Sequence, residues 1–335
     1  MPEHKKILMI LLRNIGDVVL TTPATRVLKA HYPDVAIDFV ANPAPAQILE
    51  NNPNLNEIIP YPYKPDDILG AFRFSYDLFK RNYDISIDFL GTPATALMSL
   101  ASRAEIRVGF NLRIRRLAYT HFDQNYKSGL YNALTKFTLL KPLGIEKEES
   151  RTEIFVTEEA STWVDRIFQD NGWNDRTVAL STCAMRDVRC WLPERYAEVA
   201  NWLNSQGCRV LLTWGPGERE YVEKVHALMK DSAEISPPTT LMQLAALLQK
   251  CRMLVCNCSG TKHIAVAVGT PTMTIHGPSE PSVWTPSGDP KHAYVRAENI
   301  DCLGCGESDC DHLTCMKDVS SEMVIDAIQQ MNVLS

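Results

Sequence analysis

Short apolar segments alternate with helix-length amphipathic segments along the whole chain, and this alternation restricts the fold more than any other feature of the sequence. Strands that alternate with helices predict parallel sheets assembled from β-α-β units. In the first half, strands are expected at residues 6–12, 36–40, 57–60, 83–89 and 107–110. In the second half, they are expected at residues 177–181, 209–214, 253–256 and 272–275. The chain is therefore predicted to be an α/β protein with two parallel sheets.

The chain has 335 residues, which is enough for two domains of ordinary size. We expect residues 1–165 to form the first domain and residues 166–318 the second. Residues 319–335 are predicted to form a terminal amphipathic helix, with apolar positions at Met323, Val324, Ala327 and Ile328. Ligands of parallel α/β domains bind at the carboxyl ends of the strands. Two such domains are expected to hold two substrates at a shared cleft.

The composition is that of an ordinary soluble globular protein, with 45% hydrophobic and 22% charged residues. The net charge of -6 argues against general binding of nucleic acid. No apolar run approaches the roughly 20 residues that span a bilayer. The apolar run at residues 7–12 lacks a small-residue cleavage site, so we interpret it as a buried strand rather than a signal peptide. We therefore expect a cytoplasmic protein with reduced thiols.

The segment Asn257-Cys-Ser-Gly-Thr-Lys-His-Ile-Ala-Val-Ala-Val-Gly-Thr-Pro271 marks the change from a buried strand to a helix. Its first helical turn presents backbone N–H groups together with the Ser259 hydroxyl, Lys262 and His263. A helix N-terminus with free N–H groups is a favourable site for phosphate. The next strand ends in a second small-residue turn, His276-Gly-Pro-Ser279, on the same sheet edge. Two such turns predict a nucleotide-sized ligand.

A second motif, Arg13-Asn-Ile-Gly-Asp-Val-Val-Leu-Thr-Thr-Pro23, directly follows the first strand. Gly16 permits a tight turn there, and Asp17 follows near the start of a helix. From Asp17 alone, an aspartate that caps the helix is the more common interpretation. A carboxylate at a strand end can also serve as a general base when its pKa is suitably tuned.

The two motifs together resemble glycosyltransferase family 9, the heptosyltransferases of lipopolysaccharide inner-core synthesis. The resemblance is carried by Ile15-Gly-Asp-Val-Val-Leu-Thr-Thr-Pro23 and by Ser259-Gly-x-x-His-Ile-Ala-x-Ala-x-Gly-Thr-Pro271 with His276-Gly-Pro278. It spans essentially the whole chain, and the Leu-Thr-Thr-Pro form is closest to the heptosyltransferase III-like branch. It implies the GT-B architecture, two Rossmann-like parallel-sheet domains that face a central cleft. The acceptor is then expected on the N-terminal domain and ADP-heptose on the C-terminal domain.

The resemblance makes Asp17 the catalytic base that deprotonates the acceptor hydroxyl, which then attacks the anomeric carbon with inversion. The resemblance therefore favours a general base over a helix cap as the role of Asp17. Asn14 and Gly16 are expected to bind the acceptor. Arg113, Arg115 and Arg116 lie in the same domain. Such a basic run is usually a solvated face, but it also suits the phosphates of a lipid acceptor or an anionic membrane. We therefore expect peripheral contact with the cytoplasmic face of the inner membrane.

The donor site implied by the resemblance contains one conservative and one larger departure from the family pattern. Arg189 stands where the family has a lysine that binds the donor phosphates, and a guanidinium can bind phosphate bidentately. Glu218 matches an acidic residue near the nucleoside, although a carboxylate at a helix N-terminus is also favoured by the helix dipole. Cys258 replaces an aspartate, so a different donor sugar is an alternative. The expected donor-binding residues are Arg186, Arg189, Glu218, Cys258, Ser259, Gly260, Lys262 and His263.

Four cysteines, Cys302, Cys305, Cys310 and Cys315, follow one another at spacings of x2, x4 and x4. Four thiolates at such spacing could bind a structural zinc ion tetrahedrally, with His312 as a substitute ligand. An iron–sulfur cluster, a disulfide and reduced, partly buried thiols are the alternatives, and we favour the thiols. No cofactor and no metal are expected in catalysis.

The leading hypothesis is an inverting glycosyltransferase that moves heptose from ADP-heptose to a lipid A–core acceptor of lipopolysaccharide. A transferase of the same fold that uses another nucleotide sugar is an alternative, motivated by Cys258. A non-catalytic nucleotide-sugar-binding protein and an epimerase without an acceptor belong to other functional classes. The presence of Asp17 and Arg189 argues against the non-catalytic protein.

Overall fold

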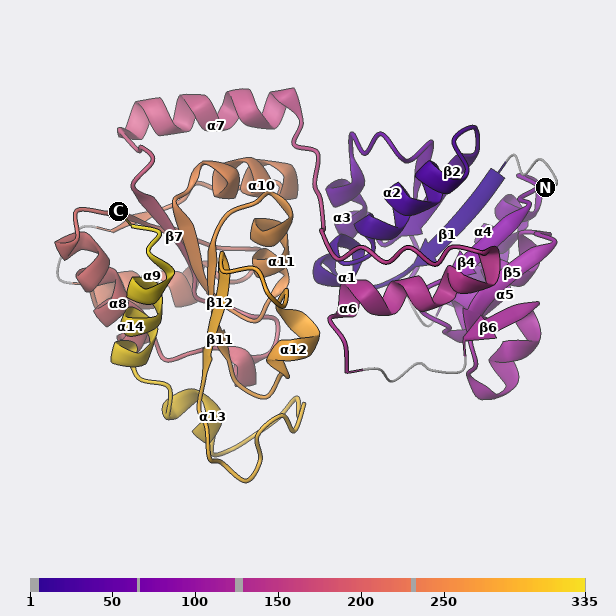
Figure 1. Cartoon of the computed structure of the whole chain (residues 1–335). Coiled ribbons are helices and arrows are strands. Elements are labelled where there is room, and N and C mark those ends of the chain that lie inside the picture. The colour runs from indigo at the N-terminus through magenta and orange to yellow at the C-terminus, as the bar shows by residue number, and fades with distance from the viewer. Residues whose placement is uncertain (1–5, 65–66, 124–128, 230–232, 335) are drawn as a thin grey trace. The chain divides into compact units, whose positions relative to one another are not determined.

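The computed structural model describes the chain except for residues 1–5, 65–66, 124–128, 230–232 and 335. The chain divides into two compact units, Met1–Phe155 and Val156–Ser335. In Figure 1 the first unit runs from indigo to magenta, and the second runs on through orange to yellow.

The first unit is built on a parallel sheet of six strands in the order β3-β2-β1-β4-β5-β6. The strands are β1 (Lys6–Leu11), β2 (Ala36–Ala41), β3 (Glu57–Pro60), β4 (Ile85–Asp88), β5 (Ile106–Phe110) and β6 (His121–Asp123). The helices are α1 (Ile15–Val19), α2 (Thr22–His31), α3 (Pro43–Ala46), α4 (Ile68–Phe79), α5 (Pro93–Ala101) and α6 (Asn132–Thr135). Short 3-10 helices, η1 (Gln47–Leu49), η2 (Arg113–Ala118), η3 (Lys136–Leu139) and η4 (Lys141–Leu143), complete the unit.

Strand β1 shows why this sheet is covered on both faces. Its successive side chains point to opposite faces, as the two-residue period of a strand requires. Ile7 and Met9 belong to one apolar cluster, with Leu28 of α2. Leu8 and Ile10 belong to another, which contains residues of α4 and α5. An apolar run of this kind, buried on both faces, is typical of central strands in parallel sheets.

The second unit repeats this plan with the strand order β12-β11-β10-β7-β8-β9. The strands are β7 (Thr177–Ser181), β8 (Arg209–Thr213), β9 (Glu234–Ile235), β10 (Met253–Asn257), β11 (Thr272–His276) and β12 (His292–Arg296). The helices are α7 (Glu158–Asn171), α8 (Pro193–Ser205), α9 (Arg219–Ala227), α10 (Leu241–Lys250), α11 (Gly260–Ala267), α12 (Pro281–Trp284), α13 (Thr314–Lys317) and α14 (Ser321–Met331), with the 3-10 helix η5 (Asp187–Arg189). The prediction of two Rossmann-like parallel-sheet domains is confirmed.

The division between the units falls ten residues before the domain boundary expected from the sequence, because α7 packs with the second unit. Lys250 at the end of α10 forms an ion pair with Asp165 of α7, and the two helices lie side by side (Figure 1). The terminal helix α14 belongs to the same unit, where Val324 and Ile328 enter the core. The apolar side of this predicted amphipathic helix therefore packs against the core of the second unit.

Each sheet has one point at which the order of its strands reverses. In the first sheet this point lies between β1 and β4, and in the second it lies between β7 and β10. Loops that follow the two strands at such a point lead to opposite sides of the sheet, and ligands of parallel α/β domains bind between them. Each unit therefore offers one favoured ligand position at the carboxyl edge of its sheet.

Candidate functional site

The candidate donor site lies at the reversal point of the second sheet. The register of β7 and β10 pairs Ser181 with Cys256, so the loops that follow these strands begin side by side. One loop carries Arg186 and Arg189, and the other leads directly into α11 at Gly260. The topology thus brings together two segments that lie about 70 residues apart in the sequence.

Three buried polar atoms of α11 and of the loop after β7 have no hydrogen-bond partner among the described residues. They are Ser259 Oγ, His263 Nδ1 and Arg189 Nε. Ser259 is the N-cap residue of α11, yet its hydroxyl makes no capping bond. Buried polar atoms are normally paired, so atoms of this kind typically serve a ligand or an ordered water. A hydroxyl and an imidazole at a helix N-terminus, with a guanidinium on the adjoining loop, are groups suited to an anion.

Asn257 connects the two loops of this site. Its Oδ1 accepts a hydrogen bond from the backbone N–H of Trp191 at 3.0 Å, and its Nδ2 donates to the carbonyl of Thr182 at 2.8 Å. Trp191 is fully buried, and its indole N–H donates to the carbonyl of Val319 at 3.0 Å. The loop that carries Arg189 is therefore fixed at its end. The sequence analysis gave Asn257 no such role, although an amide at the end of an apolar buried strand is the signal for it.

Lys262 lies in the first turn of α11 but is completely buried. Its ammonium donates to the carbonyl of Trp284 and, at 3.2 Å, to Thr285 Oγ1. Burial lowers the pKa of Lys262. These bonds connect α11 to the end of α12, so Lys262 holds the start of α11 in place. Direct contact between Lys262 and a donor stays a prediction.

His276 extends this network at the end of β11. Its Nδ1 lies 3.0 Å from Ser279 Oγ, and its Nε2 lies 3.0 Å from Thr285 Oγ1. Burial, followed by the charge of Lys262, lowers the pKa of His276 to about 2. The same two causes, in the same order, lower the pKa of His263 well below its usual value. Both imidazoles are therefore neutral at physiological pH.

The other residues predicted to bind the donor lie around the same strand ends. Cys258 is buried immediately after β10, and Arg186 is exposed at the start of η5. Glu218 is the N-cap residue of α9, and its carboxylate accepts a hydrogen bond from the backbone N–H of Gly215 at 2.7 Å. Glu218 thus closes the turn after β8, and its contact with a nucleoside stays a prediction.

The candidate base, Asp17, lies at the reversal point of the first sheet. Asn14 is the N-cap residue of α1, Gly16 is buried, and Asp17 occupies the first helical turn. The Thr21 hydroxyl binds the backbone carbonyl of Asp17 at 2.9 Å, but its half-buried carboxylate makes no hydrogen bond within the described part of the chain. The structure therefore gives the cap position to Asn14 and leaves the Asp17 carboxylate available.

Two charged groups accompany Asp17 at this edge of the sheet. Lys136 is buried, which lowers its pKa, and the charge of Asp17 opposes that shift. Asp88 at the end of β4 is completely buried and accepts hydrogen bonds from the N–H groups of Leu90 and Gly91, both at 2.9 Å, and from the Tyr119 hydroxyl at 2.6 Å. Asp88 thus shapes the loop opposite α1. The sequence analysis assigned no role to Asp88.

Comparison with known proteins identifies the family. The model for glycosyltransferase family 9 (heptosyltransferase) matches residues 71–313. The chain belongs to this family. Glycosyltransferase family 9 was predicted from the motifs at residues 15–23 and 259–271, and that prediction is confirmed.

This family 9 glycosyltransferase has relatives of similar length. It is 26% identical to lipopolysaccharide heptosyltransferase 3 of Escherichia coli K12 over 288 residues, 82% of this chain and 83% of that one. A solved family 9 glycosyltransferase from Veillonella parvula has a TM-score of 0.86 at 23% identity and covers 100% of this chain and 99% of its own. The Escherichia coli heptosyltransferase WaaC, solved with ADP-2-deoxy-2-fluoro heptose, has a TM-score of 0.74 at 20% identity, with 97% and 99% coverage.

The basic residues predicted to bind the acceptor lie in η2 of the glycosyltransferase. Arg113 and Arg116 are exposed, and Arg115 is half-buried. They follow β5 at the carboxyl edge of the first sheet, which is also the edge of Asp17. No helix among the described residues is long and apolar enough to cross a membrane.

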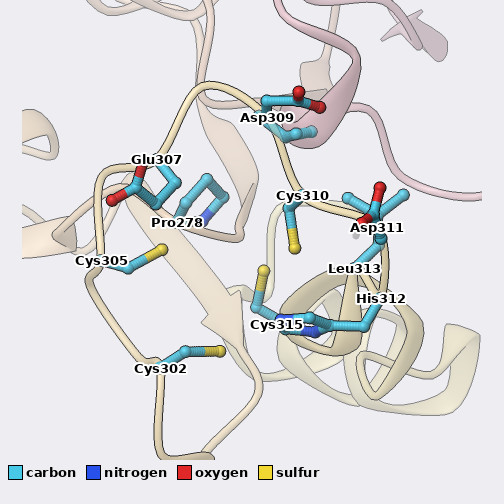
Figure 2. A pocket seen from close by; sticks show the side chains of 11 residues that line it. Pro278, Cys302, Cys305, Glu307, Asp309, Cys310, Asp311, His312, Leu313 and Cys315 are labelled. Carbon is cyan, nitrogen blue, oxygen red and sulfur yellow. The ribbon is translucent and has the colours of Figure 1, made fainter.

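The four clustered cysteines of the glycosyltransferase line a cavity of about 230 Å³ (Figure 2). All four are free thiols, and Figure 2 shows their sulfur atoms pointing into the cavity. Burial, followed by the three neighbouring thiols, raises the pKa of Cys315. No group of three or more histidine, cysteine or acidic side chains in the described part of the chain is arranged to hold a metal ion. The geometry therefore gives no support to the zinc expected as one alternative at Cys302, Cys305, Cys310 and Cys315.

Proposed function

We propose that this glycosyltransferase transfers heptose from ADP-heptose to a lipid A–core acceptor of lipopolysaccharide, with inversion at the anomeric carbon. The observation that carries the proposal is the set of unpaired buried atoms at the start of α11, Ser259 Oγ, His263 Nδ1 and Arg189 Nε. Ser259 and His263 lie at the start of α11, and Arg189 lies in the loop after the adjacent strand β7, at the reversal point of the second sheet, where a diphosphate is favoured.

The donor half of the reaction is assigned to the second unit. The bond between the anomeric carbon and the diphosphate oxygen breaks, and negative charge develops on the departing ADP. The N–H groups at the start of α11 and the Arg189 guanidinium can stabilise that charge without rearrangement. The ligands in the solved WaaC structures, ADP and a fluorinated ADP-heptose, support this choice of donor.

The acceptor half is assigned to Asp17 in the first unit. Its carboxylate takes the proton of the acceptor hydroxyl as that oxygen forms its bond to the anomeric carbon. Attack on the face opposite the leaving ADP inverts the configuration. Lys136, which interacts with the charge of Asp17, is placed to influence the carboxylate during this step. Asn14, Gly16 and the arginines of η2 are proposed to position the acceptor.

The cellular setting of the proposal is the cytoplasmic face of the inner membrane, with the protein as a peripheral enzyme. The relatives named as lipopolysaccharide heptosyltransferases support a lipid-linked acceptor. Another nucleotide sugar remains the alternative donor, because Cys258 is buried beside the first turn of α11 and offers no carboxylate to a donor.

Calorimetry and a transfer assay test the proposal together. ADP and ADP-heptose should bind and raise the unfolding temperature, because a ligand stabilises the state that it binds. Transfer should then require ADP-heptose and a lipid A–core acceptor. Preference for a UDP- or GDP-sugar would favour the alternative donor, binding without any turnover would favour a non-catalytic protein, and conversion of the donor without acceptor would indicate an epimerase.

A further inference from the structure

Helix α4 of the first unit carries large apolar side chains on its outer face. Ile68, Leu69, Phe72, Tyr76 and Phe79 are exposed by 43% to 71%. Their spacing places them along one side of the helix. The opposite side, which includes Phe74 and Leu78, is already buried against the sheet. The outer apolar side chains are thus additional to those that the fold requires.

Two neighbouring elements extend this apolar surface. Helix α5 packs beside α4, and η2 packs against α5, as Figure 1 shows for the two helices. Leu100 of α5 is 52% exposed, and Ile114 and Leu117 of η2 are 81% and 75% exposed. Contiguous apolar surface on a soluble protein generally marks an interaction site. We call these exposed side chains of α4, α5 and η2 the apolar surface.

Basic side chains accompany the apolar surface. The Lys80 ammonium lies 4.3 Å from the centre of the Tyr76 ring, and the Arg103 guanidinium lies 5.0 Å from that of Phe79. Residues 68–118 contain eight lysines and arginines against four aspartates and glutamates, whereas the whole chain has a net charge of -6. Lys80 is also paired with Asp77 at 3.3 Å and Arg81 with Glu57, but the segment that carries the apolar surface keeps an excess of four positive charges.

We propose that the apolar surface inserts into the headgroup–acyl boundary of an anionic lipid bilayer, with the surrounding lysines and arginines against lipid phosphates. Exposed leucine, isoleucine and aromatic side chains beside basic residues are the features of helices that lie in a membrane interface. A second copy of the chain fits less well, because a symmetric contact would place the same cationic groups opposite one another. The excess of positive charge therefore favours an anionic lipid surface over a second copy of the chain as the partner.

The position of the apolar surface suits a lipid-linked acceptor. Helix α4 follows β3 and η2 follows β5, and both elements begin at the carboxyl edge of the first sheet, where Asp17 lies. The inference extends the proposed function to the place where the enzyme meets its membrane, but lipid binding itself requires neither donor nor transfer.

The test is co-sedimentation of the full chain with vesicles of phosphatidylglycerol and phosphatidylcholine, or of phosphatidylcholine alone. The wild type should bind the anionic vesicles and lose that binding at high salt. The double variant Leu69→Glu/Phe72→Glu should bind at least ~10-fold more weakly, because two inserted side chains are replaced by charges that the surface repels. Lys80→Gln with Arg73→Gln should weaken binding and reduce its salt dependence.

Leu228→Glu is the matched control, since Leu228 is 45% exposed in the second unit. It should bind vesicles as the wild type does. Unfolding temperature and ADP affinity should be unchanged in all these variants, which separates a failure of this inference from a failure of the proposed donor. Wild-type binding absent at low salt, or retained by Leu69→Glu/Phe72→Glu, would overturn the inference. A dimer that Phe72→Glu dissociates would overturn it in favour of a second copy.

Discussion

Asp17, the proposed general base, illustrates how neighbouring residues can leave a carboxylate available for chemistry. From the sequence alone, a helix cap was the more common interpretation of Asp17. In the structure, Asn14 occupies the N-cap position instead. The Asp17 carboxylate, without a hydrogen bond among the described residues, lies within the electrostatic influence of the buried Lys136. A carboxylate that is neither a cap nor part of a closed network can accept a proton from a substrate.

Replacement of Asp17 by Asn should therefore separate catalysis from donor binding. We expect transfer to fall by about 10²–10⁴-fold, the usual contribution of a general base, with ADP affinity unchanged. Steady-state kinetics and calorimetry measure the two effects. Asp34→Asn, at an exposed position of the same unit, should leave both unchanged. Full activity in Asp17→Asn would remove Asp17 from the chemistry.

Arg189 is the basic residue for which the structure gives the clearest reason to expect an anion. Its Nε is buried without a partner, so removal of the guanidinium breaks no hydrogen bond of that atom. We expect Arg189→Ala to weaken ADP binding by roughly 10–150-fold, since a hydrogen bond to a charged group contributes about 1.5–3 kcal/mol.

Arg189→Lys should recover part of that affinity, because the positive charge is kept while the bidentate geometry is lost. Arg219→Ala is a suitable control, since Arg219 is engaged with Glu223 at 2.7 Å on the surface. Calorimetry with ADP compares the three variants. Equal affinity in Arg189→Ala and the wild type would place the donor phosphates elsewhere.

At the scale of elements, the central strands were predicted from the sequence, whereas of the four edge strands only β3 was predicted. The sequence analysis located the segments of β1, β7 and β10, because apolar runs buried on both faces have a strong signal. It missed β6, β9 and β12, which lie at or beside the ends of the sheet order. Edge strands are short and partly polar: β9 has two residues, and β12 exposes Tyr294. Their pairing depends on a neighbouring strand that a local pattern does not contain.

The turn from β11 to α12 couples this part of the fold to pH through His276. Burial holds its pKa at about 2 in the folded chain, whereas in the unfolded chain it is about 6.5. The unfolded state therefore binds more protons between these values. The stability that the neutral imidazole contributes is complete above about pH 6.5 and decreases as the pH falls.

The free energy of unfolding should accordingly decrease from pH 7 to pH 5, with up to about 1.4 kcal/mol per pH unit from His276 alone. Urea unfolding at several pH values measures the slope. His276→Gln should unfold more easily at pH 7 but show a smaller slope than the wild type. His121→Gln, at an exposed position, should keep the wild-type slope. An identical slope in His276→Gln would show that His276 is not the group responsible.

At the scale of the whole molecule, the sequence pointed to the segments of the two candidate sites but not to the bonds that hold each segment in place. The family motifs located Asp17 and Ser259–His263, and the sheet topology puts both at reversal points. The bonds of Lys262 to Trp284 and Thr285 could not be inferred, since they join residues more than 20 positions apart through a buried ammonium. Spacing in a sequence indicates which side chains can reach a ligand. The folded structure shows which of them already form hydrogen bonds within the protein.

In the proposed reaction the two units divide the chemistry between them, which bears on whether a metal ion takes part. The departing diphosphate needs its charge stabilised. In the proposed site, the N–H groups at the start of α11, the Ser259 hydroxyl and the Arg189 guanidinium serve that purpose, with the Lys262 ammonium buried in the same turn. These groups are fixed by the bonds of Asn257 and Lys262 before a donor arrives. If these groups bind the diphosphate as proposed, a divalent cation is not required to stabilise its charge.

Transfer should therefore persist at full initial rate in EDTA, and added Mg²⁺ should change that rate by less than about 2-fold. A cation that stabilised the departing diphosphate would change the rate far more than about 2-fold. The measurement is the initial rate after brief and after prolonged chelation. A slow loss of the active fraction, in parallel with a lower unfolding temperature, would indicate a structural metal at Cys302–Cys315 rather than a catalytic one. Immediate inactivation that Mg²⁺ fully reverses would contradict the prediction. It would require carboxylate ligands near the diphosphate, and Glu218, whose carboxylate is bound to the Gly215 N–H, would be the first residue to replace.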